Sequence, residues 1–344
     1  MKEYVLDMLL GNPVSRYMLR SVRNIFLPKI SDSNALAISI EVSSLCNAKC
    51  IFCNYRKNYR AKKLMSVQDF EIIARTCVGI GYENLNLTCL TGEFFTHPHA
   101  TEIIRISKAV GFKHVGLFTN AIALSEHDLH SILGGDLDAM LISFPGFSKK
   151  AYEEVFGVRR YESFIASIKK LLKIHKETDS NTVIVFEPRT YLTSDEIEHS
   201  DFYLDFITGY LSDKVLVRKP IRVFDTWGGT ITKDDLLPGM RLDRCSIKSI
   251  WPLKKTYLCE QILSYGILSN GDVRLCNCRC DDNVGTDKDS LLLGNLNDYT
   301  DFAEFIEKNQ NKTNKIRSEF IMGKLPELCI KCPFYYPVKV LENQ

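Results

Sequence analysis

The stretch Leu36-Ala-Ile-Ser-Ile-Glu-Val42 is followed by Cys46-Asn-Ala-Lys-Cys50-Ile-Phe-Cys53. In the first stretch apolar side chains alternate with small or polar ones, which is the pattern of a β-strand. The three cysteines therefore follow a strand, at the end where α/β sheets and barrels build their sites. Three close thiolates can bind three irons of a cubane cluster and leave the fourth iron open, whereas structural zinc requires a fourth protein ligand nearby.

Downstream of this loop, strand patterns alternate with helix patterns. Helices are predicted near 66–77, 100–110, 125–133, 161–175 and 195–210, and strands near 84–89, 113–118, 138–143, 182–186 and 214–217. Six strands separated by helices predict an α/β fold, a parallel sheet or partial (β/α)6 TIM-like barrel, over residues 35–224. Beyond residue 225 this alternation ends. We therefore expect a smaller, metal-organised domain over 225–344 and a separate N-terminal helical element over 1–34.

Composition narrows the function classes. The 344 residues include 44 basic and 42 acidic side chains, for a net charge of +2, so there is no electrostatic reason to expect nucleic acid as a partner. No apolar run approaches the roughly 18 residues of a membrane span, and charged residues interrupt the N-terminal region where a signal peptide would lie. We therefore expect a cytoplasmic protein without membrane association. The cytoplasm is a reducing compartment, so the grouping of the 12 cysteines favours metal binding over disulfide bonds.

The spacing Cys-x3-Cys-x2-Cys after a first strand, with an aromatic residue before the last cysteine, resembles the radical SAM superfamily. The resemblance implies that Cys46, Cys50 and Cys53 hold a [4Fe–4S] cluster whose open iron binds S-adenosylmethionine (SAM). It also implies that the cluster, once reduced by an electron donor such as flavodoxin or ferredoxin, cleaves SAM. The resulting 5′-deoxyadenosyl radical would abstract a hydrogen atom from the substrate.

Further residues occur in the order that this resemblance requires. It places Phe52 near the adenine of SAM, with a plain core aromatic as the alternative. Leu90-Thr-Gly92-Glu93 resembles the family's Gly-Gly-Glu segment, with Thr91 in place of the first glycine. By the same resemblance, SAM is also contacted by Asn120 after the third strand, Ser143 at the end of the fourth, and Arg159 beyond it. Asn and Ser at strand ends are also common turn residues.

A second set of cysteines lies in the C-terminal region. Asn270-Gly271 predicts a hairpin turn, which places Cys259 and Cys276 on or beside paired strands. Cys329-Ile-Lys-Cys332 follows. The layout resembles the SPASM/twitch extension of radical SAM enzymes, and specifically the shorter twitch form of 2-deoxy-scyllo-inosamine dehydrogenases. This implies one auxiliary [4Fe–4S] cluster on Cys259, Cys276, Cys329 and Cys332, with zinc on the same thiols as the alternative.

Three residues nearby have open roles. Residues two apart on a strand share a face, so Cys278 and Cys280 could point the same way as Cys276. Either could replace a cluster ligand, donate a hydrogen atom to a substrate radical, or be an inert thiol. Trp227, at the join between the two predicted domains, either lines a polar substrate pocket or packs a linker.

The resemblance favours an oxidoreductase or epimerase acting on a carbinol carbon of a sugar or cyclitol. Epimerisation or crosslinking of a ribosomal peptide is the alternative reaction. The 34 N-terminal residues are few for a separate peptide-recognition domain, which favours the small substrate. A zinc-stabilised binding protein without catalysis is the alternative from a different class.

Overall fold

The computed structural model describes residues 29–30, 37–57, 60–88, 90–242, 257–332, 335 and 337–340. Apart from strand β1 (Lys29–Ile30), the helical element expected over 1–34 lies outside the described residues, as do Cys89 and Cys245.

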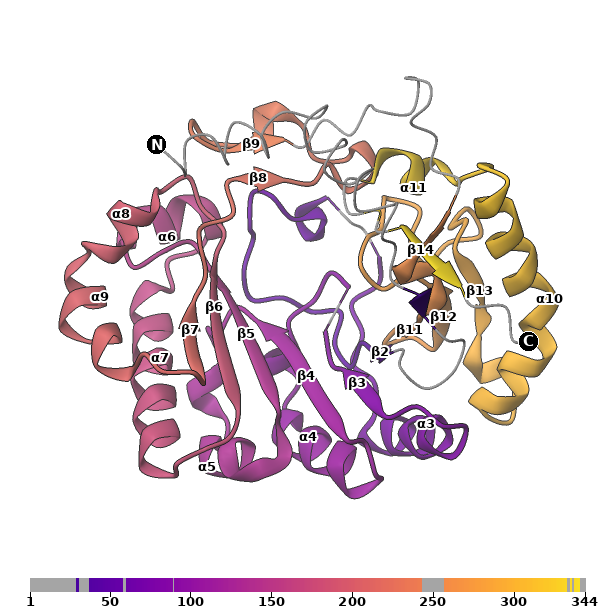
Figure 1. Cartoon of the computed structure of the whole chain (residues 1–344), viewed down its shortest axis with the longest axis horizontal. Coiled ribbons are helices and arrows are strands. Elements are labelled where there is room, and N and C mark those ends of the chain that lie inside the picture. The colour runs from indigo at the N-terminus through magenta and orange to yellow at the C-terminus, as the bar shows by residue number, and fades with distance from the viewer. Residues whose placement is uncertain are drawn as a thin grey trace.

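A single curved sheet organises the molecule (Figure 1). Its order is β13-β12-β11-β2-β3-β4-β5-β6-β7. The barrel strands are β2 (Ala37–Ile40), β3 (Asn84–Asn86), β4 (His114–Thr119), β5 (Ala139–Phe144), β6 (Val183–Pro188) and β7 (Val215–Val217). Successive members pair in parallel, which confirms the predicted parallel α/β arrangement, and the sheet remains open.

Helices cover the outer face of this sheet (Figure 1). They are α3 (Val67–Gly79), α4 (Ala100–Ala109), α5 (Leu129–Ser131), α6 (Lys149–Phe156), α7 (Tyr161–Glu177), α8 (Ser194–Glu198) and α9 (Asp201–Asp205). Ser66 caps α3 by accepting from the amide of Asp69. No helix in the described part of the chain is long and apolar enough to cross a membrane.

Two predicted helices differ from the expectation. The helix expected near 125–133 is reduced to α5 and a π-turn over Ile132–Asp136, in which Gly135 adopts φ 120°. The helix expected over 195–210 is broken into α8, α9 and a 3-10 turn (Ile207–Tyr210). Its break lies at Ser200, whose hydroxyl donates to the carbonyl of Ile197 while its backbone is extended. Such local side-chain bonds compete with helix continuation.

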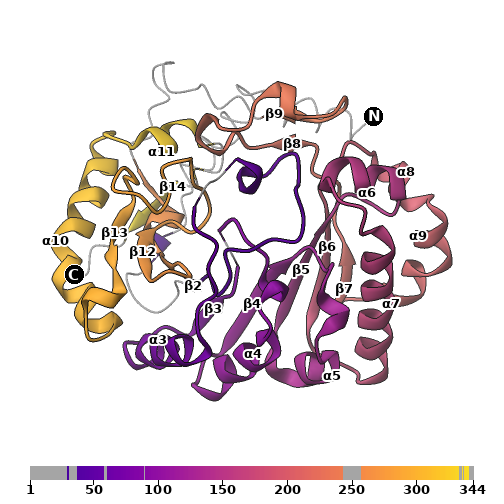
Figure 2. The same ribbon diagram turned by 180° about the vertical axis from the view of Figure 1, so that it is seen from behind.

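The C-terminal region extends the same sheet (Figure 2). The predicted hairpin is present as β11 (Tyr265–Ile267) and β12 (Asp272–Leu275), with Gly271 at φ 89° in the turn, and β13 (Leu292–Asn295) follows. Strand β11 lies parallel to β2. A fully buried carboxylate, Glu41, strengthens this junction by accepting from Ser269 Oγ at 3.0 Å and from Arg60 Nη2 at 2.8 Å.

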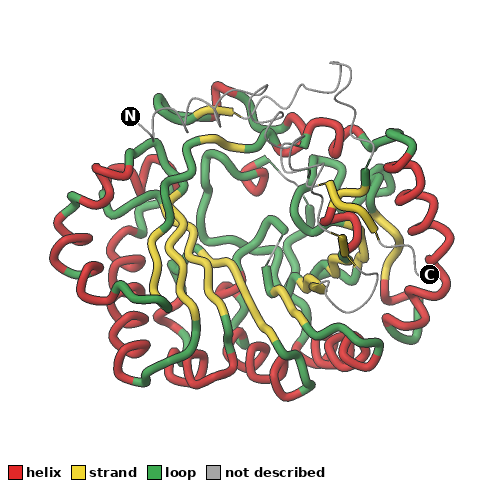
Figure 3. Tube along the Cα trace, in the orientation of Figure 1, coloured by secondary structure: helices red, strands yellow, loops and turns green. Residues whose placement is uncertain are grey.

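The remaining elements surround the second group of cysteines. They are β10 (Leu258–Cys259), α10 (Phe302–Ile321), α11 (Glu327–Lys331) and β14 (Pro337–Val340), with β14 pairing both β1 and β10. A short sheet of β8 (Val223–Phe224) and β9 (Arg241–Leu242) lies beyond the carboxyl ends of the barrel strands. Figure 3 shows that the segment after β2 is mostly loop and lies between those strand ends and β8.

Candidate active site

The loop of Cys46, Cys50 and Cys53 leaves the carboxyl end of β2 and is fixed through its backbone. The amides of Lys49 and Ile51 donate to carbonyls of α6 at 2.9 and 3.0 Å. Gly157, which ends α6 at φ 65°, permits this approach, because a Cβ there would lie 2.8 Å from the carbonyl oxygen of Lys49. The loop is therefore held against a rigid helix end.

All three cysteines are half-buried, and their thiols lie near enough to interact electrostatically. Burial is the main cause that raises their pKa values, and charge on Cys53 and Cys46 raises the pKa of Cys50 further. Thiolates in such a site repel one another unless a cation binds them. Backbone amides of Ala48 and Tyr55 point at the sulfurs of Cys46 and Cys53 at 3.5 and 3.4 Å. The donor set therefore fits an iron–sulfur cluster.

Glu93 lies behind this loop and is almost fully buried. Its carboxylate accepts from Thr119 Oγ1 at 2.5 Å and from the amide of Asn120 at 2.7 Å, while burial raises its pKa to about 7. Asn120 Nδ2 in turn donates to Asn47 Oδ1 at 2.8 Å and to Cys46 Sγ at 3.8 Å. Asn120 therefore contacts the cysteine loop directly, and Glu93 is connected to the loop through Asn120.

The backbone packed against Gly92 leaves no room for a side chain at this position. A Cβ at this position would lie 2.2 Å from the carbonyl oxygen of Ser43. The close approach expected of Gly92 is therefore made to the segment that joins β2 to the cysteines.

Phe52 is buried, and its ring stacks on Phe224 with the centroids 4.9 Å apart. Ser143 is half-buried near the end of β5, opposite Glu187 of β6. Arg159 is exposed in the bend between α6 and α7. The SAM contacts predicted for these three residues remain predictions.

Arg189 is a site residue that the sequence interpretation missed. It directly follows β6, and its charge partly offsets the rise in the pKa of Cys50 and of Cys53 that burial causes. Its guanidinium is paired with Glu187 at 2.7 Å, and Arg218 binds the other oxygen of the same carboxylate at 3.0 Å. Its position directly after a barrel strand is the signal that could have identified it.

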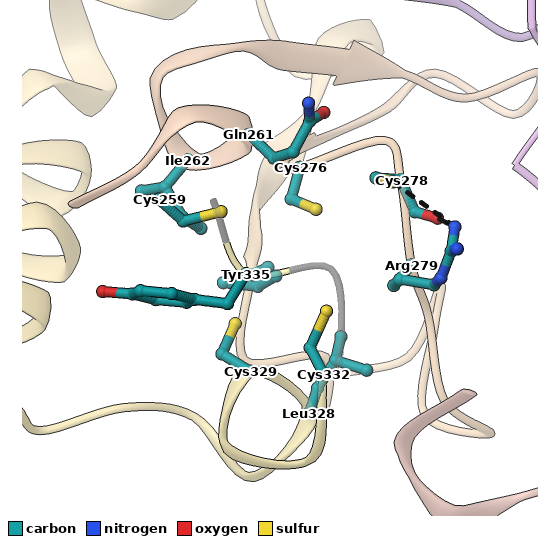
Figure 4. Close-up of a pocket in the computed structure, with 11 residues that line it drawn as sticks. Cys259, Gln261, Ile262, Cys276, Cys278, Arg279, Leu328, Cys329, Cys332 and Tyr335 are labelled. Carbon is teal, nitrogen blue, oxygen red and sulfur yellow. Dashed lines mark hydrogen bonds between the residues drawn. The ribbon is translucent and has the colours of Figure 1, made fainter. Parts of the chain in front are cut away.

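The second cysteine group lines one pocket (Figure 4). The four predicted auxiliary ligands contribute to it from β10, the end of β12, and α11 with the residue that follows it; they are Cys259, Cys276, Cys329 and Cys332. Their sulfurs are turned toward the space between them, and Tyr335, Leu328 and Ile262 supply apolar walls. The structure thus brings together all four residues that the sequence proposed for one cluster.

The turn at Cys276 explains this convergence. Cys276 has a φ of 65°, which is uncommon for a residue other than glycine, and so the strand ends there. Arg274, fully buried, donates to the carbonyls of Cys276 and Arg279 and is paired with Asp289 at 3.0 Å. This arginine therefore holds the reversed backbone in place.

The expectation that Cys276, Cys278 and Cys280 share a strand face is wrong, because β12 ends at Leu275. Cys278 lines the auxiliary pocket beside Arg279. Cys280 points elsewhere: it is fully buried among Leu90, Leu268 and Val284. Its sulfur accepts from Nδ2 of Asn54, the residue after Cys53, at 3.6 Å. Burial raises the pKa of Cys280 to about 12.

The geometry of the thiols bears on the kind of metal group. Within the described ranges, no three His, Cys, Asp or Glu side chains come together as ligands of a single ion. A cubane cluster places each thiolate on a separate iron, so its ligands surround a larger space than those of one ion. The four predicted ligands line the auxiliary pocket, and four is the number of thiolates that a cubane cluster takes.

Comparison with known proteins identifies the barrel. Residues 40–190 match the model of the Radical SAM superfamily. A probable GTP 3′,8-cyclase of Sulfurisphaera tokodaii is 26% identical over 136 residues, which are 40% of this chain and 42% of that protein. The GTP 3′,8-cyclase of Chlorobaculum tepidum is 24% identical over 39% of this chain and 40% of its own length. The chain thus spans less than half the length of these curated relatives.

Two solved structures are similar to this chain, and the first of them shares its fold. SuiB of Streptococcus suis, bound to S-adenosylmethionine, superposes with a TM-score of 0.54 at 17% identity, covering 83% of this chain and 68% of SuiB. BtrN in complex with AdoMet and 2-DOIA gives a TM-score of 0.49 at 13% identity, covering 87% of this chain and 94% of BtrN. Residues 40–190 of this chain form a radical SAM domain, of the superfamily whose members use a [4Fe–4S] cluster and S-adenosylmethionine.

Proposed function

We propose that this chain is a radical SAM oxidoreductase that removes a hydrogen atom from a carbinol carbon of a sugar or cyclitol and completes its oxidation to a ketone. The observation that carries the proposal is the second thiol pocket beside the radical SAM domain, lined by Cys259, Cys276, Cys329 and Cys332. Four thiolates supply the full ligand set of a cubane cluster. A cluster at this position offers an acceptor for an electron from the substrate.

The residues around the first cysteine loop would hold its cluster and SAM. Cys46, Cys50 and Cys53 supply the thiolates, and Glu93 and Asn120 hold the neighbouring strand ends against the loop. When bound, the cluster and SAM together supply a 5′-deoxyadenosyl radical. Arg189 lies on this side of the barrel and offers a cation for the carboxylate of SAM. Phe52, Gly92, Ser143 and Arg159 are further SAM contacts in this proposal.

The balance of the reaction favours an acceptor cluster. Abstraction of the carbinol hydrogen leaves a radical on the substrate carbon. Loss of the hydroxyl proton and one further electron then gives the ketone, so the substrate loses two hydrogens in total. Epimerisation instead returns a hydrogen atom and needs no electron acceptor. We therefore assign the outcome as oxidation. In this proposal the protein is cytoplasmic and receives reducing electrons from a flavodoxin or ferredoxin.

A peptide substrate is the second candidate for this chemistry. It would be modified by epimerisation or crosslinking, and a crosslink would likewise need an electron acceptor. The GTP of the curated relatives' names provides a further compound to test, although their similarity covers only about 40% of this chain.

The test is a turnover under anaerobic conditions with SAM, a strong reductant and candidate substrates in parallel: sugars and cyclitols, GTP and peptides. Mass spectrometry would detect 5′-deoxyadenosine and changes in substrate mass. We expect 5′-deoxyadenosine together with a sugar or cyclitol product lighter by about two mass units, the two hydrogens lost on oxidation to a ketone. A product of unchanged mass would indicate epimerisation, and a modified peptide would favour the second candidate. Zinc without iron in the purified protein would indicate the non-catalytic binding protein.

A further inference from the structure

Arg279 lines the auxiliary pocket and is linked to the first cysteine loop through Trp227. Its side chain is only 14% exposed. Its Nη1 donates to Cys278 Sγ at 3.3 Å, as the dashed lines beside Cys278 in Figure 4 indicate. A guanidinium remains charged in proteins, so this site holds a buried positive charge at every physiological pH.

Two residues of the segment after β8 fix this guanidinium. Asp225, itself buried, pairs with Arg279 Nε. The ring of Trp227 lies beneath the guanidinium, 5.0 Å from its central carbon. Asp225 Oδ1 also accepts from the amide of Trp227 at 2.9 Å, so both partners of Arg279 belong to one hydrogen-bonded turn.

The same turn contacts the first cysteine loop. Trp227 Nε1 donates to the carbonyl of Phe52, the residue before Cys53, at 2.9 Å. Trp227 adopts φ 46°, and a Cβ on the following Gly228 would lie 2.8 Å from Asp281 Cβ. Such a backbone persists only where its surroundings hold it firmly. Arg279 is therefore placed by contacts that reach from one cysteine site to the other.

A charge in this place acts on a cluster that gains one negative charge on reduction. A buried cation beside the thiolates favours the more negative, reduced form and so raises the reduction potential. Low exposure makes the effect larger than that of a cation in water. The nearby carboxylate of Asp225 has the opposite effect; it pairs with Nε of Arg279, whereas Cys278 accepts from Nη1.

We propose that Arg279 is a positioning residue that raises the reduction potential of an auxiliary cluster held by Cys259, Cys276, Cys329 and Cys332, and so prepares that cluster to accept an electron from the substrate. This inference rests on the proposed function, because it requires the auxiliary cluster. The inference adds that the electron moves from the substrate to the auxiliary cluster. The four cysteines alone do not determine this direction.

The test is a redox titration of the auxiliary cluster by electron paramagnetic resonance. The full chain carrying Cys46→Ala, Cys50→Ala and Cys53→Ala isolates that cluster's signal. In this background we expect Arg279→Gln to lower the ratio of reduced to oxidised cluster about tenfold at the parental midpoint, which equals about 59 mV for a one-electron couple. Arg279→Lys should retain most of the parental potential, and Asp225→Asn should shift it in the positive direction.

Lys331→Gln is the matched control. It removes the same charge next to Cys332, but this lysine side chain is 42% exposed and screened by water. A shift as large in Lys331→Gln as in Arg279→Gln would contradict the inference, as would an unchanged midpoint in Arg279→Gln at full iron content. If Arg279→Gln loses iron, the retained potential expected of Arg279→Lys and the positive shift expected of Asp225→Asn decide. A background protein without iron would instead overturn the proposed auxiliary cluster itself.

Discussion

The two cysteine sites of this molecule are assembled in different ways. The first takes its three thiols from one eight-residue loop that β2 and the end of α6 hold in place. The second collects its thiols from three segments spread between Cys259 and Cys332. Local spacing therefore determines the first site, whereas the second exists only when β10, β12 and α11 have packed together. Changes to one site should leave the other largely intact, and the following experiments test that separation.

Loss of a ligand at the first site should have the largest effect. We expect Cys50→Ala to lower the rate of 5′-deoxyadenosine formation by more than about 100-fold, because an incomplete ligand set leaves no cluster to cleave SAM. Chromatography of the products after incubation with SAM and dithionite measures this rate. Cys77→Ala is the control, since Cys77 is a buried core residue of α3 and should leave the rate unchanged. A parental rate in Cys50→Ala would refute the assignment of this loop.

Loss of a ligand at the second site should separate the two functions. We expect Cys329→Ala to lose about four irons per chain, one cubane, while 5′-deoxyadenosine is still formed. Cys278→Ala should keep those irons, because Arg279 already contacts its sulfur at the edge of the pocket. Iron analysis combined with the SAM cleavage assay checks both variants. If Cys329→Ala kept its full iron content and Cys278→Ala lost iron, Cys278 and not Cys329 would be the cluster ligand.

Gly92 links the sheet to the first loop and should tolerate no side chain. Gly92→Ala should destabilise the protein by roughly 2–3 kcal/mol, because the new methyl group would overlap the carbonyl of Ser43. Gly79→Ala is the control: its position in α3 has nothing within 4 Å of the new Cβ, and alanine favours helix by about 0.5–1 kcal/mol. Thermal unfolding of both variants measures the difference. Equal melting temperatures of Gly92→Ala and Gly79→Ala would contradict this expectation, because they would show that the loop after β2 moves to accommodate the added methyl group.

The smallest expected effect concerns the thiols of Cys278 and Cys280. In an oxidation neither returns a hydrogen atom, so replacement of either by alanine should leave ketone formation nearly unaltered. Turnover in deuterated water provides the measurement, since an exchangeable thiol would deliver deuterium to carbon. One new deuterium at a non-exchangeable carbon, lost in Cys278→Ala or in Cys280→Ala, would instead establish an epimerase.

Much of the barrel could be predicted because its signals are local. Four of these signals depend only on neighbours in sequence. They are the alternation at Leu36–Val42, the cysteine spacing, the Ser66 cap and the Asn270-Gly271 turn. The grouping of the four auxiliary cysteines came from resemblance.

What sequence could not show depends on contacts between distant segments. Strand alternation was extended through Cys280, but the positive φ of Cys276 ends the strand and sends Cys280 toward Asn54. Arg189 and Arg279 look like ordinary arginines until the strand ends and the turn at Trp227 are placed beside the cysteines.

The most direct test of the central claim is an iron and sulfide analysis of the anaerobically purified chain beside the variant that carries Cys46→Ala, Cys50→Ala and Cys53→Ala. Two independent cubanes predict about eight irons per chain in the parent and about four in the variant, with equal sulfide. A variant that contains no iron, or zinc in its place, would contradict an auxiliary iron–sulfur cluster in this protein.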